Sequence, residues 1–379
     1  MLAHPLDNDR LREALALAES SFGLTEPNPR VGCVIGGEDG RILGRGATQH
    51  AGGPHAELMA LRAAQALGHD VRGATAWVTL EPCAHHGRTP PCCDALIAAG
   101  IARVVVAVRD PFAQVDGAGI ARLRAAGVQV VMAEEEIAAA ARELNVGFFS
   151  RMQRGRPWLR LKIAASVDGS TALHNGHSQW ITAEDARRDG HTWRRRASAV
   201  LTGIGTALAD DPRLDVRLVP TPAQPLRVVV DSRFRLPTSA KLLAPPGKVL
   251  ICGACASASA EAALSAQGAE LLHLPGPGGE VDLAALLRVL AERGVNELQV
   301  EAGARLNGAL LRAGLVDELL IYLAPMLLGA GRPMASLGPF EALAQGLPLK
   351  WLDCSSVGAD LRIRALVERP ADAPATAPG

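Results

Sequence analysis

The chain has 379 residues, which exceeds one typical domain and predicts two or three. Its 39 acidic and 39 basic residues balance, so no net field draws it toward nucleic acid or an anionic membrane. The first residues lack the basic-then-apolar pattern of a signal peptide, and no apolar run is long enough to span a bilayer. We therefore expect a cytoplasmic protein whose seven cysteines stay reduced.

The first 150 residues or so alternate helical and strand-like patterns. Helices are expected at 9–20, 55–67, 94–99, around 123–126 and at 137–144, and strands at 31–35, 41–44, 74–80, 104–108 and 128–132. One sheet with helices on its faces accounts for this alternation.

Two short segments carry candidate metal ligands. His55 follows a proline and opens a helix that also contains Glu57, whereas Cys83 follows a strand and Cys92 opens the next helix. Residues two apart do not share a helix face, so His55 and Glu57 can meet one ion only from the helix end. One imidazole and two thiolates match a catalytic zinc site, in which water takes the fourth position. Such a water has a pKa of about 7, and Glu57 is placed to move protons.

Neighbouring residues offer alternative ligands. His85 and His86 lie on the loop between the two cysteines, and we assign them to substrate contact or loop structure because the three-ligand set is already complete. Cys93 points about 100° away from Cys92 on a helix, so we expect it in the core. A fourth protein ligand, either Cys93 or His86, would instead indicate a purely structural zinc site.

A basic stretch with a proline separates the two halves, and we place the junction near residue 153. The expected domains are 1–153 and 154–379, with a Pro/Ala-rich end from about residue 368 that is expected to be disordered. Strands are expected at 158–164, 199–202, 226–231, 248–252, 297–301 and 318–323, and helices at 183–196, 259–266, 282–293 and 304–313. Thr182 with Asp185 is expected to cap the first of these helices.

The second half lacks the Rossmann fingerprint, because the glycines at 203 and 205 are not followed by a third at the required spacing. The strand at 298–301 runs through Gly303 into a helix, a junction that can bind a phosphate. The same junction is also common for packing alone. From the residues by themselves, the arginine run at 194–196 is typical of a solvated helix face.

An H-x-E triplet followed by P-C and a second cysteine is the signature of zinc-dependent base deaminases. Here eight residues separate the cysteines, and the loop sequence HHGRTPPCC resembles the bifunctional deaminase–reductase family of riboflavin biosynthesis. Segments 162–169, 178–182, 208–217, 230–232 and 300–303 resemble the reductase domain of that family, which is similar in fold to dihydrofolate reductase. The resemblance runs in a consistent order from about residue 9 to 365.

This resemblance implies an α/β protein with a cytidine-deaminase-like three-layer α/β/α domain and a carboxy-terminal dihydrofolate-reductase-like α/β domain. It implies zinc-dependent deamination of 2,5-diamino-6-(5-phosphoribosylamino)pyrimidin-4-one. NADPH-dependent reduction then gives 5-amino-6-(5-phosphoribitylamino)uracil. The expected partners are these small molecules and further copies of the chain in a homo-oligomer, with no nucleic acid and no membrane.

Site residues follow by position from the same resemblance. Glu57 would be catalytic, and His55, Cys83 and Cys92 would bind one zinc ion. NADPH would contact Ala164, Trp180, Thr206, Asp210, Ser232, Gly303, Ala304, Arg305, Leu306, Asn307, Gly308 and Ala309. The substrate would contact Ser178, Arg194, Leu214, Arg217 and Glu301.

Some residues stay unassigned. Lys162 and Asp168 are candidates for proton transfer or positioning, and Arg233 and Arg235 could meet the 2′-phosphate of NADPH. Asn28 is either a turn residue between two prolines or an amide that contacts the pyrimidine. A nucleic-acid base deaminase is the rival function, but it needs a basic groove with aromatic residues, and aromatic residues make up 3% of this chain.

Overall fold

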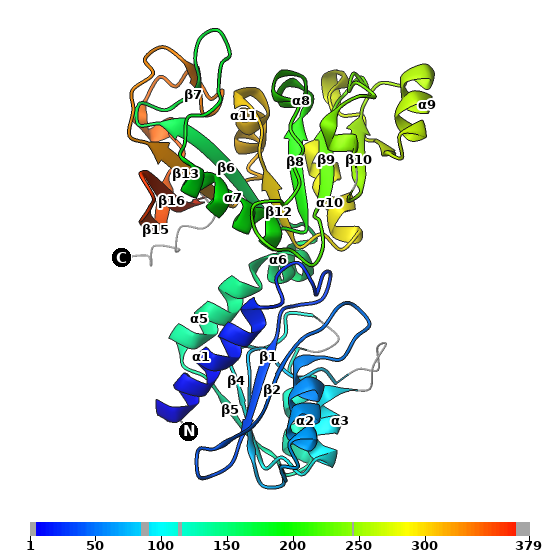
Figure 1. Cartoon of the computed structure of the whole chain (residues 1–379), viewed down its shortest axis with the longest axis vertical. Coiled ribbons are helices and arrows are strands. Elements are labelled where there is room, and N and C mark those ends of the chain that lie inside the picture. The colour runs from blue at the N-terminus through cyan, green and yellow to red at the C-terminus, as the bar shows by residue number, and fades with distance from the viewer. Residues whose placement is uncertain (1–4, 85–90, 113–115, 245, 369–379) are drawn as a thin grey trace, which may run out of the picture. The chain divides into compact units, whose positions relative to one another are not determined.

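The computed structural model describes residues 5–84, 91–112, 116–244 and 246–368 (Figure 1). The chain forms two compact units, Met1–Arg156 and Pro157–Gly379. The predicted junction near residue 153 falls inside α6 (Val146–Arg154), because this helix continues through the basic stretch and ends at Gly155. Each unit has its own hydrophobic core.

The first unit is built on a five-stranded sheet. Its order is β2 (Ile42–Ala47), β1 (Gly32–Gly36), β3 (Thr75–Val78), β4 (Arg103–Val106) and β5 (Gln129–Met132). β1 is antiparallel to both of its neighbours, whereas β3, β4 and β5 are parallel to one another.

Helices cover both faces of this sheet. Figure 1 shows α1 (Pro5–Glu19) and α5 (Glu135–Leu144) beside each other on one face, and α2 (Ala56–Ala66) and α3 (Cys92–Ala98) on the other. α4 (Ala118–Ala125) packs next to α3. The predicted three-layer α/β/α arrangement is therefore confirmed.

The backbone of β2 lies directly against the first turns of α2. The helix buries Ala56, Ala60 and Ala64, whose small side chains allow this close approach. A Cβ atom at Gly46 would overlap the carbonyl oxygen of Ala56, so only glycine fits at this point of the strand. The sheet thus fixes where α2 begins.

The second unit contains a nine-stranded sheet. Its order is β11 (Glu270–His273), β10 (Val249–Gly253), β9 (Leu226–Val230), β8 (Ala199–Gly203), β12 (Glu297–Val300), β6 (Trp158–Ser166), β13 (Glu318–Ala324), β16 (Asp360–Val367) and β15 (Leu349–Val357). The strands from β11 to β13 are parallel, whereas β16 and β15 form an antiparallel edge. β7 (Ser170–Ala172) and β14 (Arg332–Pro333) pair separately.

The parallel strands are connected mainly through helices, namely α7 (Glu184–Arg196), α8 (Ile204–Asp210), α9 (Ala258–Ala266), α10 (Leu283–Glu292) and α11 (Ala304–Arg312). The predicted cap of α7 is wrong. Ala183 is the N-cap residue, and its own N–H donates to the Asp360 carboxylate at 2.7 Å instead. A partner from β16, 177 positions away in the chain, thus replaces the local cap.

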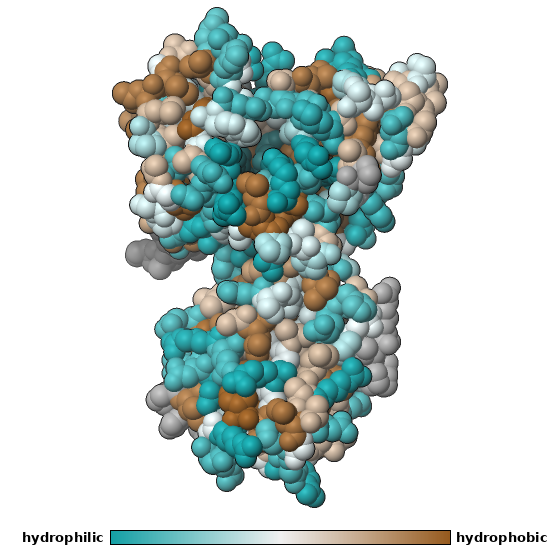
Figure 2. Space-filling view, in the orientation of Figure 1, coloured by the Kyte–Doolittle hydropathy of each residue, from teal (hydrophilic) through white to brown (hydrophobic). Residues whose placement is uncertain are grey.

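The segment after β13 exposes large apolar side chains, including Leu327, Phe340 and Leu343, and Trp351 and Leu352 of the edge strand β15 are also exposed. Figure 2 shows hydrophobic residues gathered over the loops beside β7. None of the helices within the described ranges has the length and apolar character needed to cross a membrane.

Candidate functional sites

The first unit brings the three predicted metal ligands together. His55 is the N-cap of α2, Cys83 lies in the loop after β3, and Cys92 is the first residue of α3. Their ligand atoms all lie within 4.8 Å of one another. The Nδ1 atom of His55 is 3.6 Å from the Cys83 sulfur and 3.4 Å from the Cys92 sulfur.

These distances fit a tetrahedral zinc ion. Bonds of about 2.3 Å to sulfur and about 2.0 Å to nitrogen place those two atoms roughly 3.5 Å apart at the tetrahedral angle. Hydrogen bonding from Cys92, followed by His55, lowers the pKa of Cys83, which favours the thiolate that binds metal. Among the described residues the cluster has three members, so it matches a catalytic site better than a closed structural one.

Glu57 lies in the first turn of α2 and is buried. Burial first, and the charge of Cys83 second, raise the pKa of its carboxyl to about 7, although His55 acts in the opposite direction. A carboxyl group with such a pKa can both accept and release a proton near neutral pH. The start of α2 therefore places an ionisable carboxyl group beside the cluster of candidate metal ligands.

The other residues that were considered as ligands or substrate contacts at this site lie in different environments. Cys93 is fully buried in the hydrophobic core, as expected. The N–H of Asn28 donates to the Thr25 carbonyl, so Asn28 takes part in a turn, and contact of its amide with a substrate stays a prediction. His85 and His86 lie outside the described residues.

Glu81 is a structural residue that the sequence did not single out. Its buried carboxylate accepts hydrogen bonds from the backbone N–H groups of Asp110, Gly117 and Ile120. It therefore ties the start of the Cys83 loop to the segment before α4 and to the first turn of α4. The available sequence signal was an acidic residue directly after the apolar strand-like run 74–80.

The second unit contains a cavity of about 1660 Å³ along the carboxyl ends of its central strands. A volume of this size accommodates a dinucleotide and a second small molecule. The lining includes every predicted cofactor and substrate residue except Gly308, and it also includes Lys162, Arg233 and Arg235. Gly308 packs instead against the Ser336 carbonyl.

A buried ion pair forms one wall of this cavity. The Nε and Nη2 atoms of Arg194 lie 2.6 and 2.8 Å from the two carboxylate oxygens of Glu301, and the side chains are only 13% and 15% exposed. The solvated-face interpretation of Arg194 is therefore wrong. Burial alone would raise the pKa of Glu301, but the charge and hydrogen bonds of Arg194, the charge of Lys162 and a hydrogen bond from Gln299 together outweigh it and hold the pKa well below its usual range. Burial lowers the pKa of nearby Lys162.

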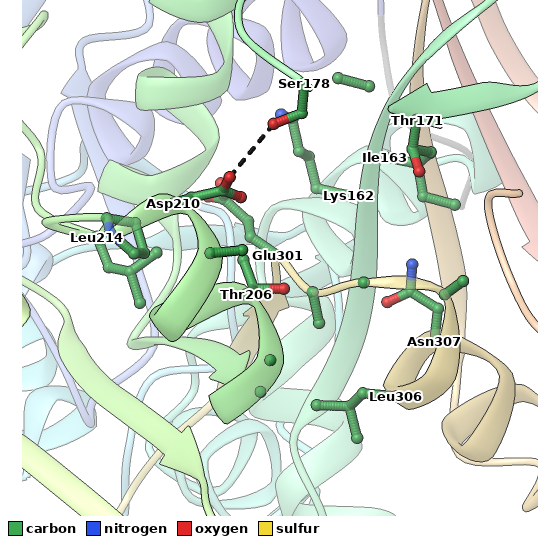
Figure 3. A pocket seen from close by; sticks show the side chains of 18 of the residues that line it. Lys162, Ile163, Thr171, Ser178, Thr206, Asp210, Leu214, Glu301, Leu306 and Asn307 are labelled. Carbon is green, nitrogen blue, oxygen red and sulfur yellow. Dashed lines mark hydrogen bonds between the residues drawn. The ribbon is translucent and has the colours of Figure 1, made fainter. Parts of the chain in front are cut away.

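The expected cofactor side of the cavity is formed by strand ends and helix starts. Gly303 is the N-cap of α11, and Thr206 of α8 lies close to it, so free N–H groups face the cavity. The Ser178 hydroxyl lies 3.3 Å from the Asp210 carboxylate (Figure 3). Ser232 donates to Glu280 at 2.7 Å.

Trp180 lines the cavity, and 64% of its surface is exposed. The guanidinium of Arg187 lies 4.7 Å from the centre of its ring and donates to the Thr182 carbonyl. An exposed indole held by a cation can provide a flat contact surface for an aromatic ligand.

Asp168 does not line the cavity. Its carboxylate accepts hydrogen bonds from the backbone N–H groups of Leu328 and Gly329, and it also bonds to the Ser166 hydroxyl. These contacts indicate loop fixation rather than proton transfer. The sequence reasoning missed His191, which is buried and lines the cavity, although its position three residues before Arg194 on one helix was an available signal.

Family models match both units. Residues 6–108 match the cytidine and deoxycytidylate deaminase zinc-binding region, and residues 157–363 match the RibD C-terminal domain. The riboflavin biosynthesis protein RibD of Escherichia coli (strain K12) is 44% identical, with 94% of this chain and 98% of the relative covered. The RibD protein of Aquifex aeolicus is 40% identical, with 94% and 98% covered.

Solved structures agree. Acinetobacter baumannii RibD (form 1) superposes with a TM-score of 0.86 at 41% identity, covering 96% of this chain and 99% of that structure. A diaminohydroxyphosphoribosylaminopyrimidine deaminase/5-amino-6-(5-phosphoribosylamino)uracil reductase from Thermotoga maritima gives a TM-score of 0.84 at 30% identity, with 96% and 99% covered. The chain therefore belongs to the RibD family of riboflavin biosynthesis proteins, which join a zinc-binding deaminase domain to a reductase domain.

Proposed function

We propose that the first unit deaminates 2,5-diamino-6-(5-phosphoribosylamino)pyrimidin-4-one and that the second unit reduces the product to 5-amino-6-(5-phosphoribitylamino)uracil. The observation that carries this proposal is the convergence of His55, Cys83 and Cys92 beside the buried carboxyl of Glu57. The large cavity of the second unit, with its buried arginine, supports the reductive step.

In the deaminase unit, His55, Cys83 and Cys92 would hold zinc, and bound zinc supplies a water of lowered pKa, about 7. Glu57 accepts a proton from the attacking water and passes a proton to the departing amino group, which leaves as ammonia. Its burial keeps competing water away from the proton path.

In the reductase unit, bound NADPH would supply the hydride that reduces the anomeric carbon of an open-chain imine form of the sugar. The residues of the chain bind and orient the reactants. Arg217 has free donors for the phosphate monoester, whereas three N–H groups of Arg194 are already used by Glu301 and by the Asp215 carbonyl. Glu301 can accept hydrogen bonds from sugar hydroxyls, and Lys162 is our candidate donor of the proton that the imine nitrogen takes up.

We also propose that the protein works in the cytoplasm as a homo-oligomer and binds neither nucleic acid nor membrane. Seven free cysteines support a reducing compartment. The exposed apolar residues Trp351 and Leu352 on the edge strand β15 support self-association. Light scattering of purified wild type and Trp351→Lys tests this, because a monomeric wild-type protein would contradict it.

The main experiment follows products by mass after purified, zinc-loaded protein is mixed with the diaminopyrimidine phosphate. Without NADPH, we expect replacement of one amino group by oxygen. With NADPH, we expect a further gain of two hydrogens. Failure of the first change would refute the proposed deaminase, and failure of the second alone would refute the proposed reductase.

A further inference from the structure

His191 lies in the reductase cavity, outside the predicted cofactor and substrate contacts. It is buried on α7, one helical turn before Arg194 on the same face, and it lines the cavity together with Arg194 and Arg217. A buried polar ring among cationic side chains needs a physical reason.

A hydrogen bond defines the state of this ring. The backbone N–H of Arg217 donates to the Nδ1 atom of His191 at 3.1 Å. Because an amide N–H can only donate, Nδ1 carries no proton, and the neutral ring has its proton on Nε2. Burial first, and then the charges of Arg194 and Arg217, lower the pKa of His191 to about 4, so the ring stays an acceptor at neutral pH.

Helix α7 also contacts the other end of the short segment 215–217. The Nη1 atom of Arg194 donates to the backbone carbonyl of Asp215 at 2.9 Å. Arg194 and His191 therefore clamp residues 215–217 by their backbone, one through a carbonyl and the other through an N–H. Between them, the Val216 N–H donates to the Gln224 side chain at 2.7 Å.

The side chain of Asp215 then orients the guanidinium groups of Arg213 and Arg217. Its carboxylate is 2.7 Å from Nη1 of Arg217 and 2.9 Å from Nε of Arg213. Arg217 is thus held at its backbone by His191 and at its guanidinium by Asp215. With 45% of its side chain exposed, Arg217 still presents donors to the cavity.

We propose that His191 is a positioning residue for phosphate recognition, which holds the backbone of Arg217 so that its guanidinium meets the phosphate monoester of the reductase substrate. This inference rests on the proposed function of the second unit. Removal of the acceptor leaves the Arg217 N–H without a partner and releases one end of the clamp, which moves the guanidinium from its binding position.

The test uses the full-length, zinc-loaded protein and two reductase substrates, namely the deaminated ribosylaminopyrimidine with and without its phosphate. His191→Leu removes the acceptor at similar volume, His191→Ala covers the case in which the leucine variant does not fold, and His191→Asn retains an oxygen that can replace Nδ1. Deaminase activity of each variant checks that the first unit is intact.

For His191→Leu or His191→Ala, we expect KM for the phosphorylated substrate to rise about 10-fold, with kcat changed much less. The dephosphorylated substrate should keep its kcat/KM within about twofold, and His191→Asn should recover most of the lost affinity. In an Arg217→Ala background, the His191 substitutions should add little, because their effect passes through Arg217.

Equal losses for both substrates would overturn the inference, because they indicate a general structural role. Unchanged KM in both the leucine and alanine variants would overturn it as well. A wild-type protein that reduces neither substrate refutes the proposed reductase itself, and this outcome is distinct from a failure of the His191 variants alone.

Discussion

Replacing Glu301 by glutamine tests how much the buried ion pair of the reductase cavity contributes to folding. The substitution keeps the shape of the side chain and one oxygen, but it removes the negative charge that Arg194 and Lys162 share. Breaking a buried pair by neutralising one partner costs about 3–5 kcal/mol. Because the side chains of Arg194 and Glu301 keep 13% and 15% exposure, we expect a loss of about 3 kcal/mol of stability, at the lower end of that range.

A unit of this length responds to 1 kcal/mol with a shift of about 2–4 °C in Tm, so Glu301→Gln should lower Tm by roughly 6–12 °C. Thermal unfolding of the full-length protein, followed by circular dichroism, measures this shift. The matched control is Glu184→Gln, which breaks a surface pair between Glu184 and Arg188 whose side chains are 71% and 56% exposed. The control should change stability by less than about 0.5 kcal/mol.

A double-mutant cycle isolates the pair. Arg194→Met combined with Glu301→Gln should be more stable than the sum of the single changes predicts, by more than about 1.5 kcal/mol, because the Arg194 charge no longer remains buried without Glu301. Additive effects, or a Glu301→Gln variant that melts like the Glu184→Gln control, would refute the reasoning.

Four further outcomes are expected. Glu57→Gln should lower deamination by about 10²–10⁴-fold while zinc content and reduction of the deaminated substrate stay unchanged, and normal ammonia release in this variant would remove Glu57 from the mechanism. Removal of the metal with a chelator should abolish deamination and spare reduction, and equal loss of both activities would contradict two independent sites. The Cys92→Ser variant should bind less zinc, as measured by atomic absorption. Arg235→Ala should raise KM for NADPH more than KM for NADH, because the 2′-phosphate loses a cation, and a parallel change in both values counts against that contact. The pKa of His191 is about 4 in the folded protein and about 6.5 in an unfolded chain, so protons bind the unfolded chain preferentially as the pH falls below 6.5. Between pH 7 and pH 5, wild type should therefore lose up to about 2 kcal/mol more stability than His191→Asn. Urea unfolding at both pH values measures this difference.

The sequence was most informative about features that depend on residues close together in the chain. The positions of His55 and Cys92 at helix starts follow from a preceding proline and from apolar spacing, and the structure places both residues there. The alternation of strands and helices was enough to predict both α/β units, because each parallel strand of a buried sheet must be followed by a crossover.

What the sequence could not provide depends on partners far apart in the chain. Arg194 sits in a charge run that looks solvated, and only its contact with Glu301, 107 positions away, shows that it is buried. The predicted cap of α7 failed for the same reason, since Asp360 supplies it from another strand. The edge strand β15 was missed because it has no buried face and thus no clear alternation.

The contact between Gly46 and the first turn of α2 has a genetic consequence. An alanine at this position would push the helix start away from the sheet and carry His55 and Glu57 with it. In a cell that relies on this chain for its flavins, Gly46→Ala would therefore behave as an auxotrophic allele, although residue 46 contacts neither metal nor substrate. A screen for strains that need added riboflavin should recover changes in this strand as well as in the ligands themselves.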